Sequence, residues 1–71
     1  MNRINPDKLK LSKWTSRNPQ NKEKHWLVTD IEKDESGVVI NCELQAVINK
    51  RTIGIDWREL KQSELWLQGW K

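Results

Sequence analysis

The sequence predicts an α+β fold in which an antiparallel β-meander of about four strands is closed by a C-terminal helical segment. Three observations lead to this prediction. Apolar residues occupy every second position from 38 to 48, which is the period of a strand with one buried face. Turn-forming residues flank this strand at positions 34–37 and 49–50. Asp56 and Glu59 have the spacing of a capping box, which marks the start of a helix.

The first two strands are expected in the N-terminal half of the chain. Residues 8–13 alternate charged or polar with apolar side chains, which indicates a short, half-buried strand. The second strand lies within residues 23–33. Because successive side chains of a strand point to opposite faces, its residues divide into two sets. One face holds His25, Leu27, Thr29 and Ile31, and the other holds Trp26 and Val28.

The third strand is expected to pair with a fourth strand at residues 51–57. A two-residue turn at positions 49–50 places Leu44 opposite Ile55. The turn between the second and third strands places Leu27 opposite Leu44, so the face that carries His25 and Leu27 is expected to be buried. A slip of one residue would move these side chains to water, and the two turns therefore support one shared apolar face.

The helical segment is expected to begin at Trp57, with Trp66 and Trp70 one helical turn apart near its end. The alternative fold is a small SH3-like β-barrel, in which the last strand folds back over the first. In either fold the 71 residues form a single domain, with residues 1–7 as a disordered N-terminal arm.

Composition excludes several classes of protein. The chain carries 13 Lys and Arg against 10 Asp and Glu, a formal net charge of +3, and its apolar residues make up only 35% of it. No run approaches the ~18 apolar residues of a membrane-spanning helix. Residues 1–6 lack the apolar segment of a secretory signal, so a cytoplasmic protein is expected. The single cysteine, Cys42, excludes an intramolecular disulfide and a cysteine-clustered zinc site.

The sequence does not predict an enzyme. The one histidine, His25, lies four positions from Cys42 along the predicted sheet, roughly 13 Å at ~3.3 Å per residue, which is too far for a nucleophile and its base. Cys42 is instead expected to be a small buried hydrophobe. The three glycines are isolated, so no phosphate-binding loop is expected. No metal site and no cofactor are predicted.

The charge distribution favours binding to single-stranded nucleic acid. Residues 1–24 carry seven cationic side chains against two carboxylates, whereas residues 25–71 carry six against eight. Two tryptophans lie among these cations, and such surfaces bind phosphates while bases stack on the rings. The predicted site consists of Lys10, Lys13, Trp14, Arg17, Lys24 and Trp26. The alternative interpretation is structural, with the lysines as a solvated rim and the rings in a small core.

A protein partner is the second functional hypothesis. Trp66 and Trp70, one turn apart on the predicted helix, would form an aromatic pair that docks in the groove of a partner, as in an adaptor or accessory subunit of a complex. The alternative is that both rings pack across the open face of the sheet.

The spaced tryptophans and their neighbours also resemble a known family. The resemblance rests on residues 5–6, 11–15, 18–19, 22–26, 50–51, 57–60 and 66–70. Together these segments resemble a family of short bacterial tryptophan-rich conserved proteins, of uncharacterised function, found in cyanobacteria and some proteobacteria. The resemblance implies a cytoplasmic bacterial protein and supplies no catalytic residue, cofactor or substrate.

Overall fold

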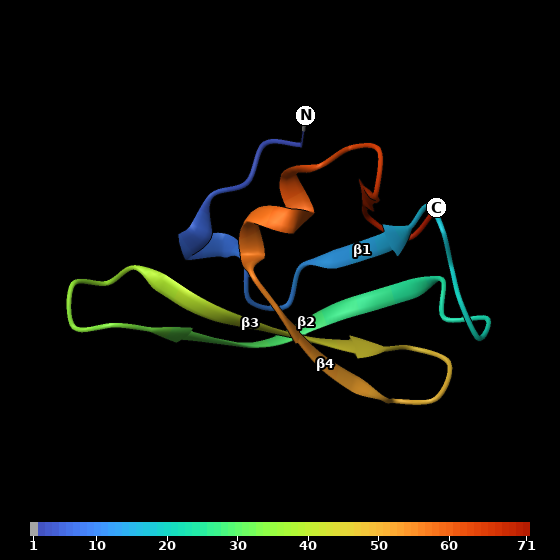
Figure 1. The fold of residues 1–71 in the computed structure, drawn as a ribbon, viewed down its shortest axis with the longest axis horizontal. Coiled ribbons are helices and arrows are strands. Elements are labelled where there is room, and N and C mark those ends of the chain that lie inside the picture. The colour runs from blue at the N-terminus through green and yellow to red at the C-terminus, as the bar shows by residue number, and fades with distance from the viewer. Residues whose placement is uncertain (1) are drawn as a thin grey trace.

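A five-stranded antiparallel sheet forms the centre of the protein in the computed structural model, which describes residues 2–71 (Figure 1). The strands lie in the order β4-β3-β2-β1-β5, so the last strand pairs with the first. Strands β2 and β3 form the longest hairpin, whose tip projects from the body of the molecule. The elements in chain order are the 3-10 turn η1 (Pro6–Lys8), β1 (Lys13–Ser16), β2 (His25–Lys33), β3 (Val39–Ala46), β4 (Thr52–Ile55), the 3-10 turn η2 (Trp57–Lys61) and β5 (Trp66–Gln68).

The predicted α+β fold with a C-terminal helix is wrong, because the C-terminal segment forms a short 3-10 turn and then a strand. The predicted cap is present, since the Asp56 carboxylate accepts a hydrogen bond from the Arg58 N–H. The turn nevertheless ends at Lys61, and the polar residues that follow offer no apolar stripe to extend it. β5 instead pairs with the otherwise unpaired side of β1. This pairing satisfies backbone groups that a short helix end would leave open.

The last strand, β5, pairs with the first strand, β1, as the alternative SH3-like barrel would require. The two outer strands, β4 and β5, are not paired with each other within residues 2–71. The structure is therefore a twisted sheet with two free edges, and both edges are short strands.

The first predicted strand, residues 8–13, is displaced toward the C-terminus. Asn5 caps η1 by accepting a hydrogen bond from the Asp7 N–H, and Pro6 occupies the first position of that turn. Leu9 is buried, whereas Leu11 is exposed and has a φ of 68°. A residue in that left-handed region interrupts a strand, so β1 begins only at Lys13.

The predicted burial of the His25 face of β2 is also wrong. Trp26 and Val28 point into the core, and Val28 lies opposite Leu44 where Leu27 was expected. A shift in register between Val28 and Asp30 then returns Ile31 to the core side. One extra residue in a strand exchanges its two faces, and a strict period of two cannot represent this exchange.

The third strand agrees with its alternation over part of its length. Cys42, Leu44 and Ala46 are fully buried, as predicted. Val38 and Ile40 were expected on the same face but are exposed, because a second register shift falls near the start of β3. Leu44 lies opposite Ile53 and not Ile55, an offset of two positions that preserves the shared apolar face.

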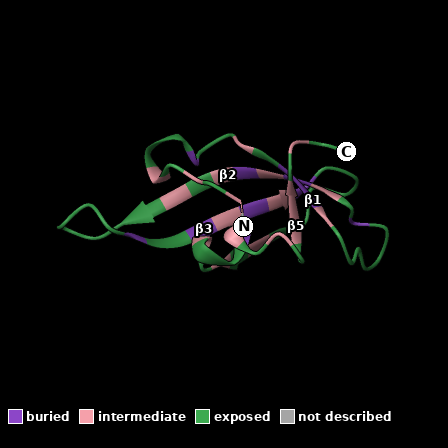
Figure 2. Ribbon diagram, turned by 90° about the horizontal axis from the view of Figure 1, so that it is seen from above, coloured by how far each residue is buried: buried purple, intermediate pink, exposed green. Residues whose placement is uncertain are grey.

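Two tryptophans occupy the centre of the core. The Trp14 indole N–H donates to the Ser12 hydroxyl, and the Trp26 indole N–H donates to the Glu23 carbonyl. Buried positions gather in the middle of the sheet, while the tip of the β2–β3 hairpin is exposed throughout (Figure 2). Each buried ring removes ~150–250 Å² from water, which makes these rings large contributors to so small a core.

The N-terminal segment contacts the C-terminal part of the fold. The Asn2 side-chain amide donates to the carbonyls of Leu60 and Trp66. These bonds attach the start of the chain, which the sequence predicted as an arm over residues 1–7, to η2 and β5. Met1 of that arm lies outside the described residues.

Cys42 is expected to be unreactive in the folded protein. Its side chain is fully buried, and burial raises the pKa of the thiol to about 11. Because the thiolate is the reactive species, Ellman's reagent at about pH 8 should label the native protein only as fast as it unfolds, and should label it fully in denaturant. Rapid stoichiometric labelling of the native protein would contradict this burial.

Candidate nucleic-acid interface

Both tryptophans of the predicted nucleic-acid site lie in the core. Trp14 is 2% exposed and Trp26 is 4% exposed, so neither ring offers a face on which a base could stack. Lys10, another predicted member, lies 3.8 Å from the Asp30 carboxylate in an exposed ion pair. The structure therefore separates these three residues from the other members of the predicted set.

The remaining predicted cations lie along the β1–β2 pair, two of them at one end and Lys13 at the other. The Ser16 N–H donates to the Lys24 carbonyl at 2.8 Å, which brings Arg17 and Lys24 to the same end of the two strands. Lys13 begins β1 on the same pair. These three side chains are exposed, and none of them forms an ion pair in the part of the chain that the structure describes.

An exposed aromatic ring lies beside Lys13, but it belongs to a residue assigned to a different site. Trp70 is 44% exposed. The Lys13 Nζ atom lies 4.8 Å from the centre of its ring, and the His25 ring lies 6.2 Å away at a tilt of 45°. We use the name Trp70 face for Lys13, His25 and Trp70 together with Arg17 and Lys24, the other two exposed cations of the same strand pair.

The chain holds Trp70 in place through a set of hydrogen bonds across β1. Gly69 has a φ of 81°, and its N–H donates to the Lys13 carbonyl at 2.8 Å. The buried Thr15 hydroxyl donates to the Gly69 carbonyl and accepts from the Lys71 N–H. The Trp70 indole N–H donates to the Trp26 carbonyl at 3.0 Å. The position of the Trp70 ring is thus fixed by the bonds of its neighbours Gly69 and Lys71 to β1 and by the bond of its own indole to β2.

The second predicted site, the C-terminal tryptophan pair, is not brought together on one surface. Trp66 packs edge-on against the buried Trp26, with ring centres 6.3 Å apart. Trp70 instead contacts His25, whose side chain points to the opposite face of β2 from that of Trp26. The two rings were expected on one helix face, and the replacement of that helix by β5 removes this arrangement.

The buried carboxylate of Glu23 lies among these cations in the sequence, but its charge is neutralised by Arg51. Arg51 donates to both Glu23 carboxylate oxygens, at 2.7 and 2.6 Å, and the Asn49 amide donates at 3.0 Å. These hydrogen bonds, with Arg51 as the largest contributor, hold the pKa of Glu23 below its ordinary value. Glu23 is the only carboxylate in residues 13–24, so that segment holds no acidic side chain besides the one paired with Arg51.

The family of the chain follows from the model that matches it. The family model described as Tryptophan-rich protein (DUF2389) matches residues 12–71. This chain belongs to that family. The match confirms the resemblance seen in the spaced tryptophans, and it includes every residue of the Trp70 face. No curated protein and no solved structure matches the chain.

In this member of the tryptophan-rich family, the described residues contain no metal-binding cluster and no membrane-spanning helix. No group of three or more His, Cys, Asp or Glu side chains within residues 2–71 could hold a metal ion. None of the helices described is long and apolar enough to cross a membrane.

The Glu23–Arg51 pair should make the stability of the fold depend on pH in the acidic range. Because the pKa of Glu23 is lowered in the folded state, the stability from this pair is complete above its ordinary pKa of 4.5 and is lost as pH falls through the folded value. Glu23→Gln should therefore lower the melting temperature at neutral pH and flatten its decline below about pH 4.5. Glu35→Gln, at an exposed turn, is the control and should leave the profile unchanged. A Glu23→Gln profile that coincides with the wild type would contradict the role of the pair.

The turn at Gly69 should be needed for the position of Trp70. A Cβ atom at φ 81° is strained by roughly 1–2 kcal/mol, although the nearest atom, Lys71 Cε, is 3.9 Å away. Gly69→Ala should thus destabilise the protein by about that amount in urea titrations and shift the fluorescence of Trp70. Gly37→Ala is a matched control, since Gly37 has a φ of 82° and open space around it, but lies in the β2–β3 turn. Equal fluorescence changes in both variants would refute a specific role for Gly69.

Proposed function

We propose that this protein is a small, non-catalytic module that binds single-stranded nucleic acid through the Trp70 face. The observation that supports this proposal best is the exposed Trp70 ring beneath the Lys13 ammonium group, at 4.8 Å. Aromatic rings and unpaired cations side by side are what a single strand requires, because bases stack on the ring and phosphates bind the cations.

The geometry suggests how the face would work. Lys13 lies over the Trp70 ring in the free protein. When a strand arrives, the ammonium group would move to a phosphate and leave that side of the indole open to a base. Because the indole N–H is already bonded to the Trp26 carbonyl, the ring loses little conformational freedom on binding.

Single strands fit this surface better than a duplex. The major groove of DNA is read by an α-helix or a two-stranded ribbon that enters it. The Trp70 face instead lies on the sheet beside a short C-terminal turn, and the described residues contain no α-helix. A flat ring at the surface reaches only bases that are already unpaired.

The adaptor hypothesis built on the C-terminal tryptophan pair receives no support from the geometry. The Trp66 ring packs against the core ring of Trp26, so of these two tryptophans only Trp70 is exposed. Trp70 is therefore assigned to the nucleic-acid face in this proposal.

Fluorescence anisotropy with a labelled mixed-sequence DNA oligonucleotide of 12 nucleotides tests the proposal. Trp70→Leu should weaken binding about 5- to 150-fold, since stacking on an aromatic ring is worth ~1–3 kcal/mol per base. Lys13→Ala should weaken binding and reduce the dependence on salt by about 0.7 in the slope of log K against log salt. The wild-type slope should be about −2, for the three unpaired cations of the face.

Lys61→Ala provides a matched control. The Lys61 Nζ atom lies 4.7 Å from the Trp57 ring, so this variant removes a similar lysine–tryptophan contact on η2, outside the Trp70 face. Its affinity for the oligonucleotide should equal that of the wild type. Absence of binding at low salt, or an equal loss in the Lys13 and Lys61 variants, would rule out the proposed face.

A further inference from the structure

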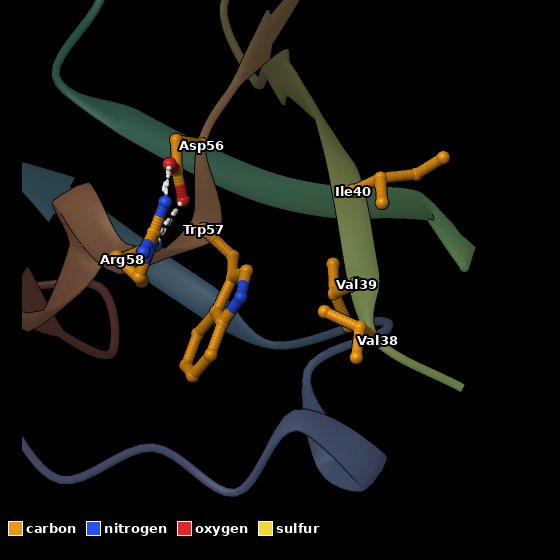
Figure 3. Close-up of a pocket in the computed structure, with 6 residues that line it drawn as sticks. All are labelled: Val38, Val39, Ile40, Asp56, Trp57 and Arg58. Carbon is orange, nitrogen blue, oxygen red and sulfur yellow. Dashed lines mark hydrogen bonds and ion pairs between the residues drawn. The ribbon is translucent and has the colours of Figure 1, made fainter. Parts of the chain in front are cut away.

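A pocket of about 390 Å³ lies between the start of β3 and the start of η2, on a surface that the proposed function does not use. It is lined by Val38, Val39, Ile40, Asp56, Trp57 and Arg58. Figure 3 shows the Trp57 indole projecting beside Val38 and Val39 with open space between them, while Ile40 points away from Trp57. The Asp56–Arg58 ion pair, at 2.7 Å, lies at one side of the hollow.

The backbone of β3 is only partly paired at this pocket. β4 pairs with β3 from Cys42 to Gln45, and the chain then leaves the sheet at Asp56 to form η2. Val39 and Asn41 pair with β2 on one side, and Ile40 lies at the register shift between them. On the other side they have no neighbouring strand within the described chain. A free stretch of strand edge is a template for another extended chain.

The side chains at this edge are unusually apolar for a surface. Val38 and Ile40 are each 56% exposed, and both lie at the pocket. Exposed apolar residues that gather beside a hollow with a polar rim mark interaction sites, whereas single exposed ones do not. The volume of the pocket falls within the ~300–1,000 Å³ of ordinary ligand sites, so it can accept at least one large side chain.

The adjoining hairpin is acidic. Residues 30–35 contain four carboxylates and one lysine, and that lysine, Lys33, is paired with Asp7 at 3.4 Å. Glu32, Asp34 and Glu35 form no ion pair in residues 2–71. Glu32 lies opposite Asn41 in the β2–β3 ladder, on the far side of β3 from the free edge, and the Asp34 carboxylate accepts a hydrogen bond from the Val38 N–H at 3.0 Å, beside the pocket. Charge complementarity therefore favours a cationic occupant.

We propose that an extended segment of a protein partner, with alternating apolar and basic side chains, binds in this hollow and adds as a strand beside residues 39–41. We call the site the β3-edge groove. Main-chain hydrogen bonds to β3 supply affinity, and apolar side chains of the segment pack against Trp57, Val38 and Val39, which face the hollow. The basic side chains, which point the other way along an extended chain, meet the carboxylates of the hairpin. The site is independent of the Trp70 face.

A seven-residue peptide in which lysine alternates with valine or isoleucine is the probe. Isothermal titration calorimetry should show saturable one-to-one binding, and hydrogen exchange should show protection at residues 39–41. Val38→Glu should weaken binding about tenfold or more, because it places a charge where the apolar side chains pack. Val47→Glu is the matched control, since Val47 is a valine of similar exposure, 46%, in the β3–β4 turn. That variant should bind like the wild type.

Two peptide variants separate strand addition from simple charge attraction. Methylation of alternate backbone nitrogens removes the donors that β3 would use and should abolish binding while the charges stay unchanged. Replacement of the apolar residues by serine should have the same effect. Equal binding by the methylated peptide, equal losses in the Val38 and Val47 variants, or no binding by the original peptide would each overturn the proposal.

Sedimentation of the free protein tests the other occupant of an open edge, a second copy of this chain. The proposal expects a monomer at concentrations up to about 100 μM, because acidic hairpins brought together would repel each other. A dimer that Val38→Glu converts to a monomer would overturn the proposal in favour of self-pairing at the same edge.

Discussion

The placement of Trp26 on the inner face of β2 is the constraint on which the rest of the structure depends. Its indole N–H bonds to the Glu23 carbonyl, its ring packs against Trp66, and its carbonyl accepts the Trp70 indole N–H. In the sheet it lies between Trp14 on β1 and Ala46 on β3. One residue therefore joins the core, the buried Glu23–Arg51 pair and the C-terminal turn. A small core with few apolar residues depends on such rings, because each one buries ~150–250 Å².

The inward position of Trp26 also determines what the other face of the sheet presents. Since successive side chains alternate, His25 must point outward, and it meets Trp70 there. The aromatic platform proposed for nucleic acid is thus made by the last tryptophan, while two earlier ones stabilise the core. The cations predicted from the charge of the N-terminal third remain part of the proposed site. The aromatic ring beside them is Trp70 from the C-terminus, and not Trp14 or Trp26 as expected. Thr15 and Gly69 hold Trp70 at this position, because their hydrogen bonds attach the C-terminal turn to β1.

The two register shifts have consequences for the opposite end of the sheet. The shift after Val28 returns Ile31 to the core, and the shift near the start of β3 turns Val38 and Ile40 outward. Because β4 leaves the sheet at Asp56, these exposed side chains lie beside a stretch of unpaired strand edge. The molecule therefore presents two surfaces of different character. One is cationic with an exposed indole, and the other is apolar with an acidic hairpin, which suits them to partners of different chemistry.

Local sequence patterns determined the family, the buried centre of β3 and the cap at Asp56, because each of these depends on residues close together in the chain. Of the proposed site, the sequence predicted Lys13, Arg17 and Lys24 as cations of a nucleic-acid surface, and it assigned Trp70 to a different site. Tertiary structure decided which face of β2 is buried, since one extra residue in a strand exchanges inside and outside without a local signal. It also decided that the C-terminal residues form β5, because the partner that satisfies their backbone groups, β1, lies more than fifty residues earlier. Which tryptophan faces water follows from these two long-range pairings, and no spacing within the sequence records them.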